Sequence, residues 1–319
     1  MSLTTKLQPV FIILSAFVGL LLGYLTPFGS FSVHLIEPFL MVLLYFVFLS
    51  VDGQKLKESF RNVKFTVTAL SVNFLWTPVF AYLLGILFFR DSIDLQMGLL
   101  MLMVTPCTDW YLVFTGLANG NVALGASILP LNLFLQIVLL PVYLLLFFCG
   151  SVSFNGASVV LSIVIVLIIP FALSFVTKLI GKSGESWETK IERLKERGDD
   201  AQLLFLCMAV ISMFASESKE VFQNPVLLLR MLIPLAIFFA VNFVLVHWVG
   251  KKEGLAFEDT IALNFTTLAR NSPLSLAIAV VAFPDRPLIS LALVIGPLIE
   301  LPALSIIANI IKRAERLKY

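Results

Sequence analysis

Apolar runs of about 20 residues alternate along the chain with short charged or turn-forming segments. An α-helix needs about this length to cross the roughly 30 Å hydrocarbon core of a bilayer. We expect the longest hydrophilic segment, residues 181–200, to be a loop of mixed charge. The pattern predicts ten membrane-spanning helices, at about residues 9–26, 35–52, 65–89, 95–118, 121–147, 154–180, 200–216, 225–249, 256–282 and 286–312.

The composition supports an all-α integral membrane protein. Of 319 residues, 59% are apolar and 13% are charged, and the net charge is only +2. An average soluble domain has about 25% charged residues. The chain therefore needs a lipid bilayer as its partner, and a soluble enzyme, a disordered chain and a nucleic-acid binder are excluded. It contains no phosphate-binding glycine loop and no catalytic triad, so we expect neither an enzyme nor a bound cofactor; its oligomeric state stays open.

The basic residues predict the orientation of the chain. With the N-terminus inside, 17 Lys and Arg fall in inner loops and tails, and only Arg90, Lys219 and Arg286 fall in outer loops. Positively charged loops stay on the cytoplasmic side. We expect both termini in the cytoplasm, and the compact form and short tails favour a bacterial inner membrane.

Matching prolines suggest an internal repeat. A shift of 167 residues carries Pro106 onto Pro273 and Pro130 onto Pro297. We expect one membrane domain built from two halves, residues 1–150 and 151–319, with five spans each. Because five is odd, the second half enters the membrane from the opposite side, which makes the repeats inverted, as in many transporters.

Two segments should interrupt their helices near the middle of the membrane: Thr105-Pro106 and Asn271-Ser272-Pro273. Proline removes a backbone donor, and unpaired backbone is tolerated in a membrane only where it lines a cavity enclosed by protein. Simple kinks are the alternative. The symmetric placement favours two discontinuous helices that cross, the fourth and the ninth, whose half-helix ends face a substrate.

Three ionisable residues lie near the middle of their spans: Asp109, Arg270 and Glu300. Each costs at least about 2.5 kcal/mol if unpaired at the bilayer centre, so each should face the protein interior. A structural ion pair between Asp109 and Arg270 is one interpretation. The other is that Asp109 and Glu300 carry a proton during transport.

Cys107 directly follows Pro106, where an unwound backbone would leave its thiol in a cavity. A single cysteine in an apolar span is usually an inert small side chain. Next to a half-helix N-terminus, however, its thiolate would be favoured, and a thiolate binds soft metals and metalloids. Amides that could line the site are Asn73, Asn132, Gln136, Asn242, Asn264 and Asn271.

The segment Thr105-Pro-Cys-Thr108 resembles the arsenite efflux permeases, the arsenical-resistance branch of the superfamily that also holds the bile acid:sodium symporters. The resemblance continues through residues 117–124, 131–132, 269–279 and 298–302. It implies two inverted five-helix repeats, a panel part and a core part, and broken fourth and ninth helices that cross at the substrate. By this resemblance Cys107 matches the metalloid-transport cysteine.

The chain also departs from the family pattern. Ser275 stands where the arsenite permeases carry a functional glutamate, and Asp109 stands where a small uncharged residue is usual. Thr266 and Arg270 match the glutamate and glutamine that help to coordinate sodium in the symporters. A guanidinium is a fixed positive charge, so sodium coupling is not expected.

These observations together predict a secondary transporter that exports arsenite or antimonite in exchange for protons by alternating access. A sodium-independent transporter of a small organic anion held by Arg270 is the alternative, and a membrane receptor or enzyme is a third, weaker one. Cys107 would bind the metalloid, and Asp109 and Glu300 would carry protons. The expected substrate-binding residues are Cys107, Thr108, Asp109, Asn132, Arg270, Asn271 and Ser272.

Overall fold

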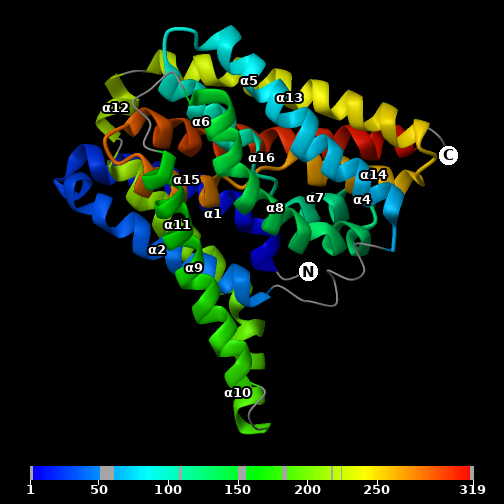
Figure 1. The fold of residues 1–319 in the computed structure, drawn as a ribbon, viewed down its shortest axis with the longest axis horizontal. Coiled ribbons are helices and arrows are strands. Elements are labelled where there is room, and N and C mark those ends of the chain that lie inside the picture. The colour runs from blue at the N-terminus through cyan, green and yellow to red at the C-terminus, as the bar shows by residue number, and fades with distance from the viewer. Residues whose placement is uncertain are drawn as a thin grey trace. The chain divides into compact units, whose positions relative to one another are not determined.

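A computed structural model describes residues 3–50, 61–107, 110–149, 156–181, 185–216, 218–223 and 225–316 of the chain. The regular elements of these residues are helices (Figure 1). They are α1 (Leu3–Leu25), α2 (Phe28–Ser50), α4 (Val63–Ser71), the π-helix η1 (Val72–Trp76), α5 (Thr77–Phe88), α6 (Ile93–Met103), α7 (Trp110–Leu117), α8 (Val122–Phe148), α9 (Gly156–Gly181), α10 (Glu185–Glu196), α11 (Gly198–Ser216), α12 (Ser218–Gln223), α13 (Pro225–Lys252), α14 (Phe257–Leu268), α15 (Ser272–Ala282) and α16 (Pro287–Arg316).

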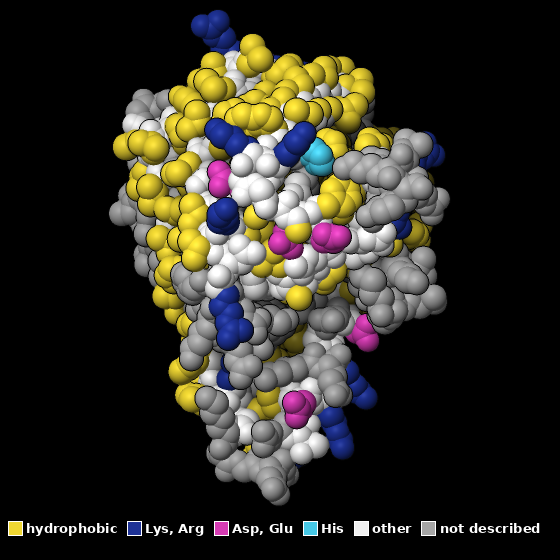
Figure 2. All heavy atoms as spheres, turned by 90° about the vertical axis from the view of Figure 1, so that its right-hand side faces the viewer, with side chains coloured by type: hydrophobic (Ala, Val, Ile, Leu, Met, Phe, Trp, Pro, Cys, Tyr) yellow, Lys and Arg dark blue, Asp and Glu magenta, His cyan; other side chains and the backbone are white. Residues whose placement is uncertain are grey.

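The apolar helices confirm an all-α membrane protein. Among the described residues, five helical segments are long and apolar enough to cross a bilayer: Phe28–Phe46, Val63–Phe88, Val122–Phe148, Leu229–Lys252 and Pro287–Arg313. Four shorter apolar helical segments accompany them. Figure 2 shows hydrophobic side chains gathered over the upper part of one face, with charged side chains across its middle. Helices occupy all ten predicted positions, but the count of ten crossings, the inverted repeat and the cytoplasmic termini remain predictions.

The prediction of a loop at residues 181–200 is wrong for most of that segment, because Glu185–Glu196 forms α10. Trp187, Ile191 and Leu194 recur at helical spacing and give α10 an apolar side. The ammonium of Lys190 lies 4.6 Å from the centre of the Trp187 ring, one turn away. The high charge of the segment hid this amphipathic pattern.

The described helices belong to two compact units. Unit 1 comprises Met1–Val51, Asn155–Pro225 and Leu276–Ser290, and unit 2 comprises Asp52–Phe154, Val226–Ser275 and Leu291–Tyr319. Each unit takes segments from both predicted halves of the chain. The units therefore cut across the predicted boundary at residue 150.

Close backbone contact holds unit 1 together. Helix α11 packs against α1 and α2, and α9 packs against α2. Gly19 and Gly23 are four residues apart on α1 and face α11. A Cβ atom on Gly19 would lie 2.5 Å from the carbonyl oxygen of Ile211, and a Cβ atom on Gly23 would collide with the carbonyl oxygen of Ala215. Small residues at this spacing allow two membrane helices to approach closely.

Replacing Gly23 by alanine should destabilise unit 1. The new Cβ would meet the Ala215 backbone, which cannot rotate away as a side chain can, so α1 must move from α11. Overpacking of this kind costs about 1–3 kcal/mol. We expect a lower unfolding temperature of the purified protein. The control is Gly198→Ala, whose new Cβ would lie 4.0 Å from Phe46 and should be tolerated; equal stability of the two variants would contradict the prediction.

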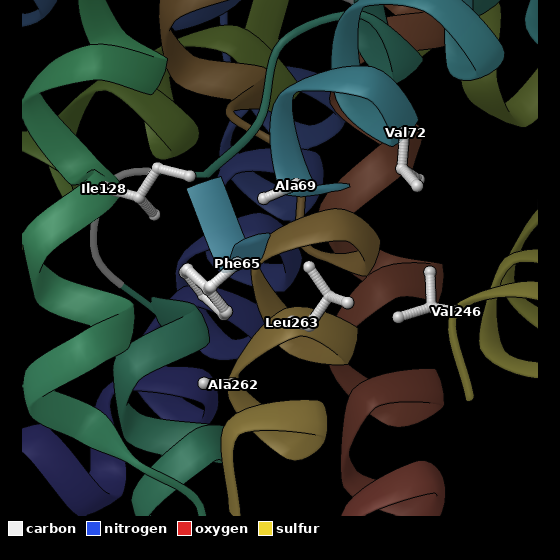
Figure 3. Packing of buried hydrophobic residues seen from close by; sticks show 7 residues of the cluster. All are labelled: Phe65, Ala69, Val72, Ile128, Val246, Ala262 and Leu263. Atoms are coloured by element: carbon white, nitrogen blue, oxygen red, sulfur yellow. The ribbon is translucent and has the colours of Figure 1, made fainter. Parts of the chain in front are cut away.

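Unit 2 has its own apolar core (Figure 3). The core side chains come from α4, η1, α8, α13 and α14, so segments from both halves of the sequence contribute to this core. Its buried members are Phe65, Ala69, Val72, Ile128, Val246, Ala262 and Leu263.

The π-helix η1 interrupts the third predicted span where Pro78 follows it. Because Pro78 has no backbone N–H, the carbonyl of Phe74 lacks its usual donor four residues on. The Tyr143 hydroxyl of α8 donates to this carbonyl at 2.7 Å. The irregular turn places Asn73 in the interior of unit 2, where it is fully buried. Such π-turns often mark functional sites.

Arg230 forms a two-pronged ion pair at the start of α13. Its guanidinium nitrogens donate to the two carboxylate oxygens of Asp91 at 3.0 and 2.7 Å, and to the carbonyl of Phe88 at 3.1 Å. The hydrogen bond from Arg230, followed by a backbone hydrogen bond, lowers the pKa of Asp91 below its ordinary value of 3.8.

This lowered pKa predicts a pH-dependent contribution to stability. A carboxylate with a depressed pKa stabilises the fold above its unfolded pKa and loses that effect as pH falls through the folded pKa. Wild type should therefore unfold about 1–3 °C above Asp91→Asn near neutral pH. The gap should close below about pH 4. Thermal unfolding of both proteins across pH checks this; a gap that widens in acid would refute it.

Candidate functional site

Two predicted spans are interrupted where their prolines lie. Helix α6 ends at Met103 and α7 begins at Trp110, and α14 ends at Leu268 while α15 begins at Ser272. Pro106 lies between α6 and α7, whereas Pro273 lies in the first turn of α15, where proline is tolerated because its missing N–H would have no partner there. Both segments predicted to interrupt a helix therefore lie at a break.

The two breaks meet and satisfy each other's backbone. Pro106 and Arg270 form an isolated antiparallel bridge. The Cys107 N–H donates to the Ala269 carbonyl at 2.9 Å, and the Asn271 N–H donates to the Thr105 carbonyl at 2.7 Å. Unpaired backbone groups inside a membrane are costly. We call this meeting point, residues 104–107 with 269–271, the crossover.

A pair of hydroxyl groups joins the helices beside the crossover. The Thr105 and Ser275 hydroxyl oxygens lie 2.7 Å apart, and the Ser275 hydroxyl donates to the Met101 carbonyl at 2.9 Å. Ser275 is fully buried. In this chain it ties the start of α15 to the end of α6.

The guanidinium of Arg270 gathers oxygen atoms from three elements. Its three nitrogens donate to the Met103 carbonyl at 2.7 Å, the Leu268 carbonyl at 3.2 Å and the Asn73 side-chain oxygen at 3.3 Å. Its central carbon lies 4.9 Å from the centre of the Phe238 ring of α13. The side chain is only 3% exposed.

This arrangement explains how a buried positive charge is accommodated. Met103 and Leu268 are the last residues of α6 and α14, and a helix C-terminus carries a partial negative charge of about half an electron. Two such ends together balance one guanidinium. Arg270 is therefore the centre that holds the ends of both broken helices in place.

Glu300 of α16 also reaches the crossover. Its carboxylate accepts the backbone N–H of Arg270 at 2.8 Å, and the side chain is 3% exposed. The carboxylate thus meets the backbone of Arg270, while the guanidinium binds other oxygens. Glu300 is a buried carboxylate directly beside the break in the ninth span.

Cys107 lies at the crossover with its side chain 5% exposed. Across from it, the Asn271 side chain caps α15 by accepting the Leu274 N–H at 3.2 Å, and Ser272 is the buried first residue of that helix. The predicted residues Thr108 and Asp109 lie outside the described residues. The predicted pairing of Asp109 with Arg270 stays a prediction.

The amide of Asn132 on α8 contacts α14 one helical turn before the crossover. Its nitrogen donates to the Thr266 hydroxyl at 3.1 Å, and the Asn73 amide donates to the Thr266 carbonyl at 3.3 Å. The structure therefore gathers Cys107, Arg270 and Glu300 at one point and Asn132 beside them. Cys149, by contrast, is exposed, and Cys207 is half-buried in unit 1.

Sequence reasoning missed the partners of Arg270. The carbonyls of Met103 and Leu268 act through the backbone, which leaves no signal in residue type. Phe238 is one of 29 phenylalanines, so nothing marks it. Asn73 was expected in the lining, and Pro78 was a usable sign of the irregular turn that positions it.

Comparisons of the sequence with known proteins identify several relatives. The chain is 25% identical over 323 aligned residues to the arsenical-resistance protein Acr3 of Corynebacterium glutamicum, covering 95% of this chain and 87% of that protein. It is 22% identical to Acr3 of Alkaliphilus metalliredigens, over 85% of this chain and 79% of that protein. It is also 22% identical to the uncharacterized transporter slr0944 of Synechocystis, over 98% of this chain and 89% of that protein.

A family-wide comparison extends this result. The sequence model of the Sodium Bile acid symporter family matches residues 37–224, which is more than half of the chain and includes the first break with Cys107. The two broken helices and their shared crossover are thus found in a chain that belongs to the sodium bile acid symporter family.

Proposed function

We propose that this chain exports arsenite or antimonite, the uncharged hydroxides of trivalent arsenic and antimony, by secondary transport. A transporter family implies a small-molecule substrate, and two relatives are named arsenical-resistance proteins. The observation that carries the proposal is the buried thiol of Cys107 at the crossover. A thiolate is the protein ligand that soft metalloids prefer.

The remaining crossover residues would hold the hydroxyl groups of the substrate. Helices α7 and α15 both begin beside the crossover, and helix N-termini favour oxygen atoms that carry negative charge. Asn271 and Ser272 lie at the start of α15. Asn132 of α8 contacts Thr266, one turn of α14 before the crossover. Thr108 and Asp109 would complete the site.

Proton exchange is the proposed driving force. Glu300 touches the backbone of the crossover, so a change in its protonation would alter a hydrogen bond that helps to position Arg270. Asp109 is the second proposed proton carrier. The transport cycle would alternate access to the crossover from the two sides of a bacterial inner membrane.

Sodium coupling is not part of the proposal. Carbonyl and amide oxygens of the kind that coordinate alkali cations surround Arg270, but its guanidinium already binds them. Because the guanidinium occupies these oxygens, they are not free to coordinate sodium. The same contacts weaken Arg270 as an anchor for an organic anion, since three of its five N–H groups already donate to protein oxygens.

Expression in cells that lack their own arsenite efflux tests the proposal. The wild-type chain should restore growth on arsenite or antimonite. Everted membrane vesicles should accumulate labelled arsenite when a proton gradient is imposed, with or without sodium. Growth no better than with empty vector, together with vesicles that accumulate no arsenite, would refute the proposed function.

A further inference from the structure

Unpartnered polar atoms collect in the interior of unit 2. Among the described residues, six buried side-chain atoms have no hydrogen-bond partner: Thr77 Oγ1, Asn132 Oδ1, both amide atoms of Gln136, Asn242 Nδ2 and Asn264 Oδ1. All of them belong to unit 2. A buried donor or acceptor without a partner is destabilising, and native proteins keep few. A group of them therefore calls for a ligand or for water.

Asn132, and Gln136 one turn further along α8, are linked to the proposed substrate site through Thr266 of α14. They are four residues apart on α8, so they share one face of the helix. Gln136 is 1% exposed, and Asn132 is fully buried. On the same face, Asn132 reaches Thr266 of α14 and Tyr143 reaches Phe74 of η1. Gln136 lies between these two contacts, so its amide faces the interior of unit 2.

Thr266 connects this pair to the crossover. It lies three residues before Ala269, whose carbonyl accepts the Cys107 N–H. Three residues of helix span about 5 Å. A molecule that binds the Cys107 thiol could therefore extend toward the α8 amides without leaving unit 2.

The chemistry of the free groups selects an uncharged ligand. Gln136 has a free amide donor and a free acceptor, and Asn132 has a free acceptor; none of them carries charge. The nearby charge of Arg270 is already balanced by the ends of α6 and α14. An anion would find no free positive partner among these groups, whereas a hydroxyl can both donate to and accept from amides.

We infer that Gln136 and Asn132, with Thr266, form a subsite that binds the hydroxyl groups of an uncharged trihydroxide. The inference rests on the proposed function, to which it adds a second set of contacts to the substrate. The Cys107 thiol would replace one hydroxyl of the trihydroxide and release a water molecule, and the α8 amides would bind the remaining hydroxyl groups. We call Gln136, Asn132 and Thr266 the amide subsite.

The test uses two variants that keep side-chain size. Gln136→Met removes the unpartnered amide, and Thr266→Val removes one hydroxyl with little change in shape. Arsenite transport into everted vesicles is measured for each, along with the unfolding temperature of the purified protein with and without boric acid. Boric acid is an uncharged trihydroxide with little affinity for thiols, so its binding reports on the amide subsite and not on Cys107.

Both variants should raise the KM for arsenite, by about fivefold for each hydrogen bond lost and up to about 30-fold for Gln136→Met. Both should also lose the stabilisation that boric acid gives to wild type. The matched control is Gln202→Met, the same change at a buried glutamine of unit 1, which should keep both properties.

The outcomes separate the two proposals. If wild type exports no arsenite, the proposed function fails, and the boric acid shift alone decides on the amide subsite. If wild type exports arsenite but Gln136→Met keeps its KM and its boric acid shift, the subsite holds only water and the inference is overturned. Absence of a boric acid shift in wild type also overturns it. Because the lost amide is unpartnered, Gln136→Met should fold normally, and its unfolding temperature without ligand verifies this.

Discussion

Replacing Cys107 by serine should abolish arsenite export while the protein still folds. Serine has nearly the same size but offers a hard hydroxyl in place of a soft sulfur ligand. Loss of an outer-shell partner of a metal ligand already costs about 10–100-fold in affinity or activity, so for loss of the ligand itself we expect a fall in kcat/KM of at least about 100-fold. The measurement is arsenite uptake by everted vesicles, with the unfolding temperature as the test of folding.

The other two cysteines supply the matched controls for this variant. Cys149 is exposed at the end of α8, and Cys207 lies in unit 1. Cys149→Ser and Cys207→Ser should therefore transport arsenite as wild type does. Wild-type kcat/KM in Cys107→Ser would contradict the assigned role of Cys107. A loss of similar size in all three variants would point to a general effect of thiol removal.

Replacing Arg270 by methionine should destabilise the protein more than Gly23→Ala or Asp91→Asn does. The change leaves the carbonyls of Met103 and Leu268 and the amide of Asn73 without their donor inside the membrane. Removing one partner from a buried charged network costs about 3–5 kcal/mol. For a chain of this size the unfolding temperature should fall by about 10 °C. Transport should be lost as well, because the ends of both broken helices are no longer held.

Arg270→Lys and Arg313→Met complete this experiment. Lysine keeps the charge but not the planar fork that reaches three oxygens at once, so Arg270→Lys should remain well below wild type in stability. Arg313 is exposed on α16, and its replacement should be tolerated. If Arg270→Met unfolds at the wild-type temperature, Arg270 does not organise the crossover.

The positions of the membrane helices could be predicted because a bilayer imposes a simple length rule. A helix buried in lipid needs about 20 apolar residues, and each charged residue within it is costly. Residues 122–148, for example, are uninterrupted by charge and form the single helix α8. The breaks could be predicted from the symmetric placement of Pro106 and Pro273, but not from the missing proline donor alone, since Pro130 and Pro141 lie within α8 without ending it.

From the sequence, three residues of the crossover region could be identified, but their contacts could not. Cys107, Arg270 and Glu300 were identifiable because a polar residue is conspicuous where nearly everything else is apolar. Their partners were not identifiable, since Arg270 bonds to the carbonyl of Met103, 167 residues away in the sequence. A backbone carbonyl is present at every position, so nothing in the sequence distinguishes the one that is used.

The sequence by itself determined the membrane class, the approximate helices, the two breaks and the few charges that need interior partners. These features follow from local properties: apolar length, proline chemistry and the cost of charge in lipid. Only the tertiary structure decided that the two breaks meet, that Arg270 balances the ends of two half-helices, and that Gln136 is left without a partner. These facts depend on which distant segments pack together, and that is set by contacts summed over a whole unit rather than by any local pattern.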